Sequence, residues 1–175
     1  HYPGENYTPF SGENNPHRTH DKCVLCHMDT EVGTTDEYGV LTVGGHTFRM
    51  RDFGDDSIPD TGDDTLNKAV CQGCHGSVST FDINGTQTEV HSLLIELETL
   101  LTENNFGFLP ANEPGNCARC HKGGTVPFRN DPDNILENAY TNYKLIANDR
   151  SRGVHNPGYI KKLLQDSIDS INNHY

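Results

Sequence analysis

Cys23-Val-Leu-Cys26-His27, Cys71-Gln-Gly-Cys74-His75 and Cys117-Ala-Arg-Cys120-His121 are three copies of one five-residue pattern in a chain of 175 residues. Together they use all six of its cysteines. The pattern Cys-x-x-Cys-His is typical of covalent c-type haem attachment, in which both thiols add to the vinyl groups and the histidine ligates the iron. It therefore predicts three haems, held by Cys23, Cys26, Cys71, Cys74, Cys117 and Cys120, with His27, His75 and His121 as proximal ligands.

Zinc binding and disulfide formation, two other uses of cysteine, explain the three motifs less well. Zinc sites also contain Cys-x-x-Cys pairs, but they do not require a histidine directly after the second cysteine in every copy. A disulfide framework of a secreted protein would have no reason to repeat the same five-residue pattern three times. Haem attachment is the better interpretation because the pattern repeats.

The composition is poor in material for an ordinary core. Only 33% of the residues are hydrophobic, and the mean hydropathy is −0.70. Three apolar macrocycles would supply the interior that such a chain lacks. We therefore expect a single trihaem domain over residues 1–175, with a haem-centred interior, long irregular segments, and residues 1–22 as an N-terminal arm or ordered loop.

The net charge of −12 limits the partners. It argues against binding to nucleic acid, which requires a basic face, and against an anionic membrane surface. It is compatible with steering towards basic redox partners, or with solubility alone. The longest apolar-rich stretch, residues 92–101, is interrupted by Glu96 and Glu98, so no membrane insertion is expected. Because c-type haem is attached outside the cytoplasm, we expect that a signal peptide has been removed before His1.

Apolar spacing predicts three helices, all in the C-terminal half. The first starts near Thr88, after a capping-box pattern over residues 86–89. The second starts at Asp131-Pro132 and the third at Asn156-Pro157, where an N-cap residue precedes proline. A short strand-like piece is expected at Val40–Val43. The fold class is thus loop-rich and mainly α, with little or no β. The expected apolar faces are Leu93, Leu94, Leu97, Leu100 and Leu101; Ile135, Leu136, Ala139, Tyr140, Tyr143, Ile146 and Ala147; and Ile160, Leu163, Leu164, Ile168 and Ile171.

Residues 52–64 contain six aspartates in thirteen positions. Carboxylate oxygens are ligands that Ca²⁺ accepts, but the spacing differs from that of an EF-hand loop. A solvated acidic loop is the favoured interpretation, with Ca²⁺ as the alternative.

The ligand opposite each proximal histidine decides what the haems can do, because an open position permits substrate binding and a second protein ligand favours electron transfer. Seven histidines lie outside the motifs, enough to close all three irons. His155, just before the Asn-Pro helix start, is the first choice. His46, in Val43-Gly-Gly-His-Thr-Phe-Arg-Met50, is the second, because two glycines permit a close backbone approach to a macrocycle. The third ligand is left open between His17 and His20, with His91 as a further candidate or a packing residue.

Several of these segments together resemble secreted multihaem cytochromes c, including members that serve extracellular electron transfer and polymerise into filaments. They are Pro16-His17 with His20 and the first motif, Gly44-Gly-His-Thr-Phe48, Cys71-Gln-Gly-Cys-His-Gly76, Gln87-Thr-Glu-Val90 and Arg152-Gly-Val-His-Asn-Pro-Gly-Tyr159. The resemblance covers most of the chain and implies bis-histidine haems in close-packed pairs, with His155 as a distal ligand. This chain differs from the filament-forming members in the number of haems: it has sites for three, and they usually carry four or more.

The sequence thus predicts electron transfer through three haems, without enzymatic activity, by a protein located outside the cell or at its surface. The expected partners are redox donors and acceptors, and further copies of the chain with haems stacked across subunits, where His1, His17 or His20 could ligate an iron of the neighbouring copy. A discrete periplasmic shuttle is the first alternative. The second is reduction of a small oxyanion at one open haem.

Overall fold

The computed structural model describes residues 17, 22–30, 35–58, 61–104, 106 and 133–175. The contacts divide the chain into two compact units. One unit, Pro16–Gly85, contains the first two Cys-x-x-Cys-His motifs, and the other includes Thr86–Tyr175 with the three long helices. Cys117, Cys120, His121, His1 and His20 lie outside the described residues, as do Asp131 and Pro132.

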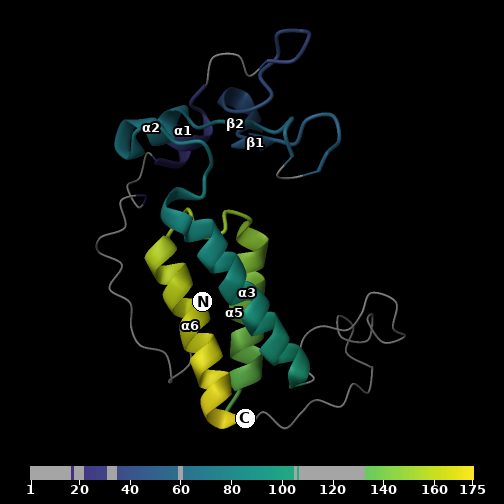
Figure 1. The fold of residues 1–175 in the computed structure, drawn as a ribbon, viewed down its shortest axis with the longest axis vertical. Coiled ribbons are helices and arrows are strands. Elements are labelled where there is room, and N and C mark those ends of the chain that lie inside the picture. Colours follow the sequence, from purple (N-terminus) through teal and green to yellow (C-terminus); the bar gives the residue numbers. More distant parts are fainter. Residues whose placement is uncertain (1–16, 18–21, 31–34, 59–60, 105, 107–132) are drawn as a thin grey trace. The chain divides into compact units, whose positions relative to one another are not determined.

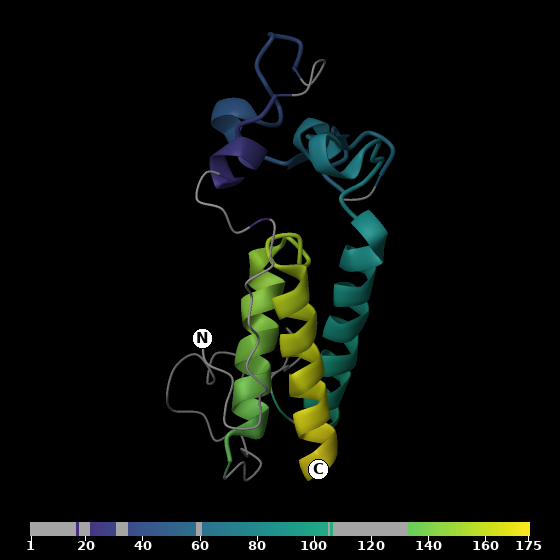
Figure 2. The same cartoon turned by 90° about the vertical axis from the view of Figure 1, so that its left-hand side faces the viewer.

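The described part of the unit that includes Thr86–Tyr175 is a three-helix bundle. Its helices are α3 (Thr86–Glu103), α5 (Ile135–Asp149) and α6 (Pro157–His174). They run side by side in Figures 1 and 2, with α5 antiparallel to α3 and α6. The expectation of a mainly α fold with its helices in the C-terminal half is confirmed.

The helix starts follow local signals to different degrees. The α6 helix begins as expected, because the Asn156 side chain accepts a hydrogen bond from the backbone N–H of Tyr159 and Pro157 occupies the first turn. The α3 helix begins two residues earlier than predicted, at Thr86. The predicted start of the second helix falls outside the described residues, and the described part of α5 begins at Ile135, after Asn134.

The bundle has a core made of its own side chains. Most of the predicted apolar positions are buried or half-buried, but Ala147 is exposed. In this unit, therefore, the described apolar side chains pack against one another to form a core. The haem-centred interior remains a prediction for the chain as a whole. The buried residues are Val90, Leu97, Leu101, Phe106, Ile135, Leu136, Ala139, Ile146, Ile160, Leu163, Leu164, Ile168 and Ile171.

Polar residues also enter this interior, which apolar spacing did not predict. Asn142 on α5 is buried and donates from Nδ2 to Ser167 Oγ on α6, at 3.2 Å. The Ser167 hydroxyl in turn donates to the carbonyl of Leu163 at 2.7 Å. Because both groups have partners, the desolvation cost of this pair is offset and the pair fixes the register of α5 against α6.

The other unit has little regular structure. Two short helices, α1 (Lys22–His27) and α2 (Ala69–His75), hold the first two motifs. Two antiparallel strands, β1 (Arg51–Asp52) and β2 (Thr65–Leu66), flank the aspartate-rich loop. Its described residues also form two 3₁₀ turns, η2 (Gly45–Thr47) and η3 (Ile83–Gly85).

The expected strand at Val40–Val43 is wrong. These residues form no strand: Leu41 makes an isolated bridge with Thr35, and the Val40 carbonyl accepts from the N–H of Asp36, in a turn that the Asp36 carboxylate holds. Among the helices in the described ranges, none combines the length and the apolar character needed to cross a membrane.

Candidate functional site

The first two motifs each occupy a single short helix. In α1, Cys23, Cys26 and His27 stand at positions i, i+3 and i+4, and α2 repeats this arrangement with Cys71, Cys74 and His75. Residues at this spacing lie on one face of a helix. Each helix therefore presents two thiols and an imidazole on the same side, which is the arrangement that attachment to one macrocycle requires. Cys23 and Cys74 carry exposed free thiols, and α1 and α2 contact each other.

The imidazole of His27 is held in one orientation by Phe48. Its Nδ1 lies 2.9 Å from the carbonyl oxygen of Phe48, which can only accept, so Nδ1 carries the hydrogen. In the neutral ring the lone pair then belongs to Nε2, the nitrogen that would ligate iron. The phenyl ring of Phe48 also stacks on the imidazole, with centroids 4.6 Å apart and planes inclined by 11°. This combination fixes both the tautomer and the rotation of His27, as a metal-ligating histidine would require.

A glycine-dependent turn brings Phe48 to this position. Gly45 N–H donates to the carbonyl of Met28, directly after α1, at 3.2 Å. A Cβ on Gly44 would lie 2.0 Å from the carbonyl oxygen of Asp29, so only glycine fits there. Gly44 thus lies close to the backbone after α1, and the expected approach of these glycines to a macrocycle remains a prediction. Phe48 ends the turn with φ 57°, a left-handed conformation that is costly for a bulky residue.

His17 and His75 lie close together although 58 positions separate them in the sequence. Their ring centroids are 6.4 Å apart and the ring planes are inclined by 63°. An imidazole nitrogen binds a transition metal at about 2 Å, so two rings on opposite sides of one metal have centroids about 6 Å apart. The separation of His17 and His75 thus fits two axial ligands of one iron. Of the two equally weighted candidates upstream of the first motif, His17 is the one the structure describes.

His155 is exposed in the turn before α6. Its Nδ1 lies 2.9 Å from Oδ1 of Asp149, and the hydroxyl of Ser151 holds the other carboxylate oxygen. A carboxylate behind an imidazole is a frequent arrangement in metal sites, because it fixes the tautomer and raises the basicity of the ring. Sequence reasoning attributed the direction of His155 to Pro157 and helix packing, and it missed Asp149. The signal available was an acidic residue at the end of the preceding helix.

The remaining predicted ligands are less constrained. His46 is exposed in η2, and His91 is exposed on α3, so its alternative role as a packing residue is not supported. Among the described residues, no group of three or more His, Cys, Asp or Glu side chains is arranged to hold a bare metal ion.

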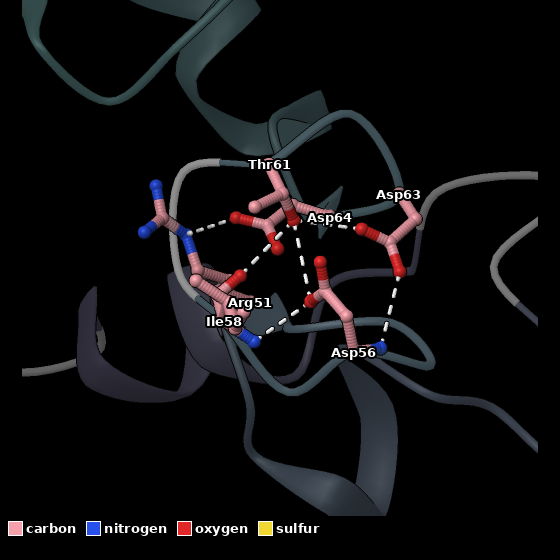
Figure 3. A network of polar contacts seen from close by, with 6 residues as sticks. All are labelled: Arg51, Asp56, Ile58, Thr61, Asp63 and Asp64. Carbon is pink, nitrogen blue, oxygen red and sulfur yellow. Dashed lines mark hydrogen bonds and ion pairs between the residues drawn. The ribbon is translucent and has the colours of Figure 1, made fainter.

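The aspartate-rich loop is organised by its own hydrogen bonds (Figure 3). Asp63 Oδ2 accepts from the backbone N–H of Asp55, and Asp63 Oδ1 accepts from the Thr61 hydroxyl at 2.7 Å. Asp56 Oδ1 accepts from the N–H of Ile58 at 2.7 Å. The hydrogen bond from Thr61 is the main cause that holds the pKa of Asp63 below its ordinary value. These bonds account for a structured acidic loop, and Ca²⁺ binding remains a prediction.

Comparison with known proteins adds no assignment. No protein-family model, no curated protein and no solved structure matches this chain. The function must therefore be argued from the site itself.

Proposed function

We propose that this protein transfers electrons through three covalently attached c-type haems, each closed by two histidines. The observation that carries the proposal is the pair His17 and His75, whose rings are separated by the distance expected of two axial ligands of one iron. The hydrogen bonds at Nδ1 of His27 and His155 support it, because both leave Nε2 as the ligating nitrogen.

The residues suit electron transfer better than catalysis at iron. Attached haems would supply an iron that changes oxidation state without making or breaking bonds. The chain supplies thiols for attachment, a proximal imidazole, and a second imidazole that occupies the position a substrate would need. Bis-histidine ligation also lacks the methionine ligand that raises the potential in other cytochromes. We therefore expect a non-enzymatic role for the protein and a low reduction potential for its haems.

Location and assembly belong to the same proposal. Haem attachment outside the cytoplasm and the resemblance to secreted multihaem cytochromes support an extracellular or cell-surface protein, with a periplasmic shuttle as the alternative. The histidine-rich segment ahead of the first motif supports assembly of several copies. Because His17 faces His75 of the same chain, a ligand shared between copies would come from His1 or His20. Electron microscopy of the secreted protein tests assembly, and a monodisperse monomer would exclude it.

The coordination can be tested by removing one imidazole. The mature protein should carry three haems by mass, and all three should be low-spin by EPR. In His17→Ala, one of the three should become high-spin while the haem content stays unchanged. His174→Ala is the matched control, because His174 lies at the exposed end of α6 and its Nδ1 donates to the carbonyl of Ser170.

The outcomes separate the parts of the proposal. A mature protein without covalent haem would refute the function altogether. Three haems that all remain low-spin in His17→Ala would refute only the role of His17. A high-spin haem in the unaltered protein that binds nitrite would favour the oxyanion reductase instead.

A further inference from the structure

We propose that Asn67 is a positioning residue that fixes the spacing of the first and second haems, by tying the end of α1 to the start of α2 through its buried side chain. The inference rests on the proposed function, because it assumes haem at both motifs. It goes beyond that function by naming a residue, outside the motifs and outside the predicted iron ligands, that sets the distance an electron must cross between these two haems.

The side chain of Asn67 reaches the segment that directly follows α1. Its Nδ2 donates to the carbonyl oxygen of Asp29 at 2.7 Å, across 38 positions of the sequence. Asp29 lies just beyond the end of α1 at His27, and the N–H of Met28 still continues the helix by donating to the carbonyl of Val24 at 2.9 Å. The contact therefore holds the chain next to the groups of the first motif.

The backbone of Asn67 is held at the start of the second motif. Its N–H donates to the carbonyl of Met50 at 2.9 Å, which extends the pairing of β1 and β2 by one residue. The α2 helix begins at Ala69, directly after Lys68, and the N–H of Cys71 donates to the carbonyl of Lys68 at 3.0 Å. One residue thus joins the strand pair, the start of α2 and the end of α1.

The surroundings of this hydrogen bond are closely packed. Asn67 is fully buried. A Cβ on Gly44 would lie 2.9 Å from Nδ2 of Asn67 and 2.0 Å from the Asp29 carbonyl oxygen, so the glycine turn lies directly against the bond. The same turn is fastened to α1, because the N–H of Gly45 donates to the carbonyl of Met28 at 3.2 Å. Loss of the bond would be costly, since a buried amide would lose its partner with little access to water.

This tie bears on electron transfer because each haem would be attached to its helix at two points. A macrocycle held by two thioether bonds follows the position of the helix that carries both cysteines. The α1 and α2 helices contact each other, and Asn67 links their ends. Since the rate of electron transfer falls steeply with the distance between haem edges, a constant separation of the two helices would keep that rate constant.

The first test examines the tie in the unaltered protein. In the reduced protein, whose low-spin ferrous haems are diamagnetic, NMR can follow exchange of side-chain amide hydrogens with solvent. Those of Asn67 should exchange at least about tenfold more slowly than those of Asn84, which is exposed in the same unit. Equal exchange rates would mean that no lasting contact is made and would overturn the proposal.

The second test measures the spacing itself. Asn67→Asp keeps the size of the side chain but places an oxygen against the Asp29 carbonyl, so the tie is lost. The matched control is Gly54→Ala, because Gly54 has φ 63° and an added Cβ would lie 2.2 Å from Oδ2 of Asp63, in the acidic loop of the same unit. Pulsed EPR of the oxidised proteins gives the iron–iron distances, and a chain with Cys117→Ala and Cys120→Ala, which omits the third haem, identifies the distance between the first two.

The distance between the first and second irons should shift or broaden in Asn67→Asp and stay unchanged in Gly54→Ala. An unchanged distance in Asn67→Asp, or equal changes in both variants, would overturn the proposal. If Asn67→Asp does not fold, the exchange rates in the unaltered protein decide. Absence of covalent haem from the unaltered protein would refute the proposed function, and this inference with it, so the two kinds of failure are distinguishable.

Discussion

Leu164→Ala tests whether the helical bundle holds itself together without haem. Leu164 lies on α6, its side chain is fully buried, and it belongs to the core shared by α3, α5 and α6. Truncation of a buried leucine costs about 2–5 kcal/mol, the lost transfer free energy plus a cavity term. For a unit of this size, a loss of about 3 kcal/mol corresponds to a fall in Tm of roughly 12–24 °C.

The assay is thermal and urea unfolding, followed by far-ultraviolet circular dichroism, of the full chain produced without haem attachment. The unaltered apo-protein should show one cooperative helical transition, and Leu164→Ala should lower it by the amount above. Leu145→Ala is the matched control, because Leu145 on α5 is 43% exposed and its truncation should change stability by less than about 0.5 kcal/mol.

Two results would refute the reasoning. An apo-protein without a cooperative transition would mean that the haems are needed to form the bundle, as the low hydrophobic content alone suggested. Equal losses for Leu164→Ala and Leu145→Ala would mean that the buried side chains do not form a packed core.

Two further predictions concern backbone conformation and pH. Gly44→Ala should lower the thermal stability of the holoprotein by more than Gly39→Ala does. Both glycines have positive φ, so alanine at either position costs about 1–2 kcal/mol of backbone strain. Only at Gly44 does the added Cβ also meet the carbonyl of Asp29. Equal losses would contradict that contact. Burial, and then the charge of Glu98, raises the pKa of Tyr143 from 10.0 to about 12. As the pH rises, this tyrosine therefore ionises in the unfolded chain before it ionises in the folded one. The stabilising contribution of Tyr143 that is present below pH 10 is thus lost as the pH rises towards 12. Urea unfolding of Tyr143→Phe over this range should therefore show a weaker fall with pH, and parallel curves would exclude the effect.

Much of the bundle could be predicted because its signals are local. The α6 helix follows from Asn156, Pro157 and an apolar residue on each turn, and every position predicted for its buried face is buried. Periodicity failed where burial depended on the neighbours: Ala147 fits the stripe of α5 but is exposed, while Asn142 is polar and buried against Ser167.

The candidate site likewise has one part that local sequence predicts and another part that depends on the tertiary structure. The sequence by itself determined which groups are candidates for haem attachment, because the Cys-x-x-Cys-His spacing places two thiols and an imidazole on one helical turn. Only the tertiary structure decided what those imidazoles face. His27 meets Phe48 across 21 positions, and His17 meets His75 across a longer separation. The first of these pairs depends on a turn with unusual backbone angles at Gly44 and Phe48. These angles follow from close contacts with other segments, which local periodicity does not record.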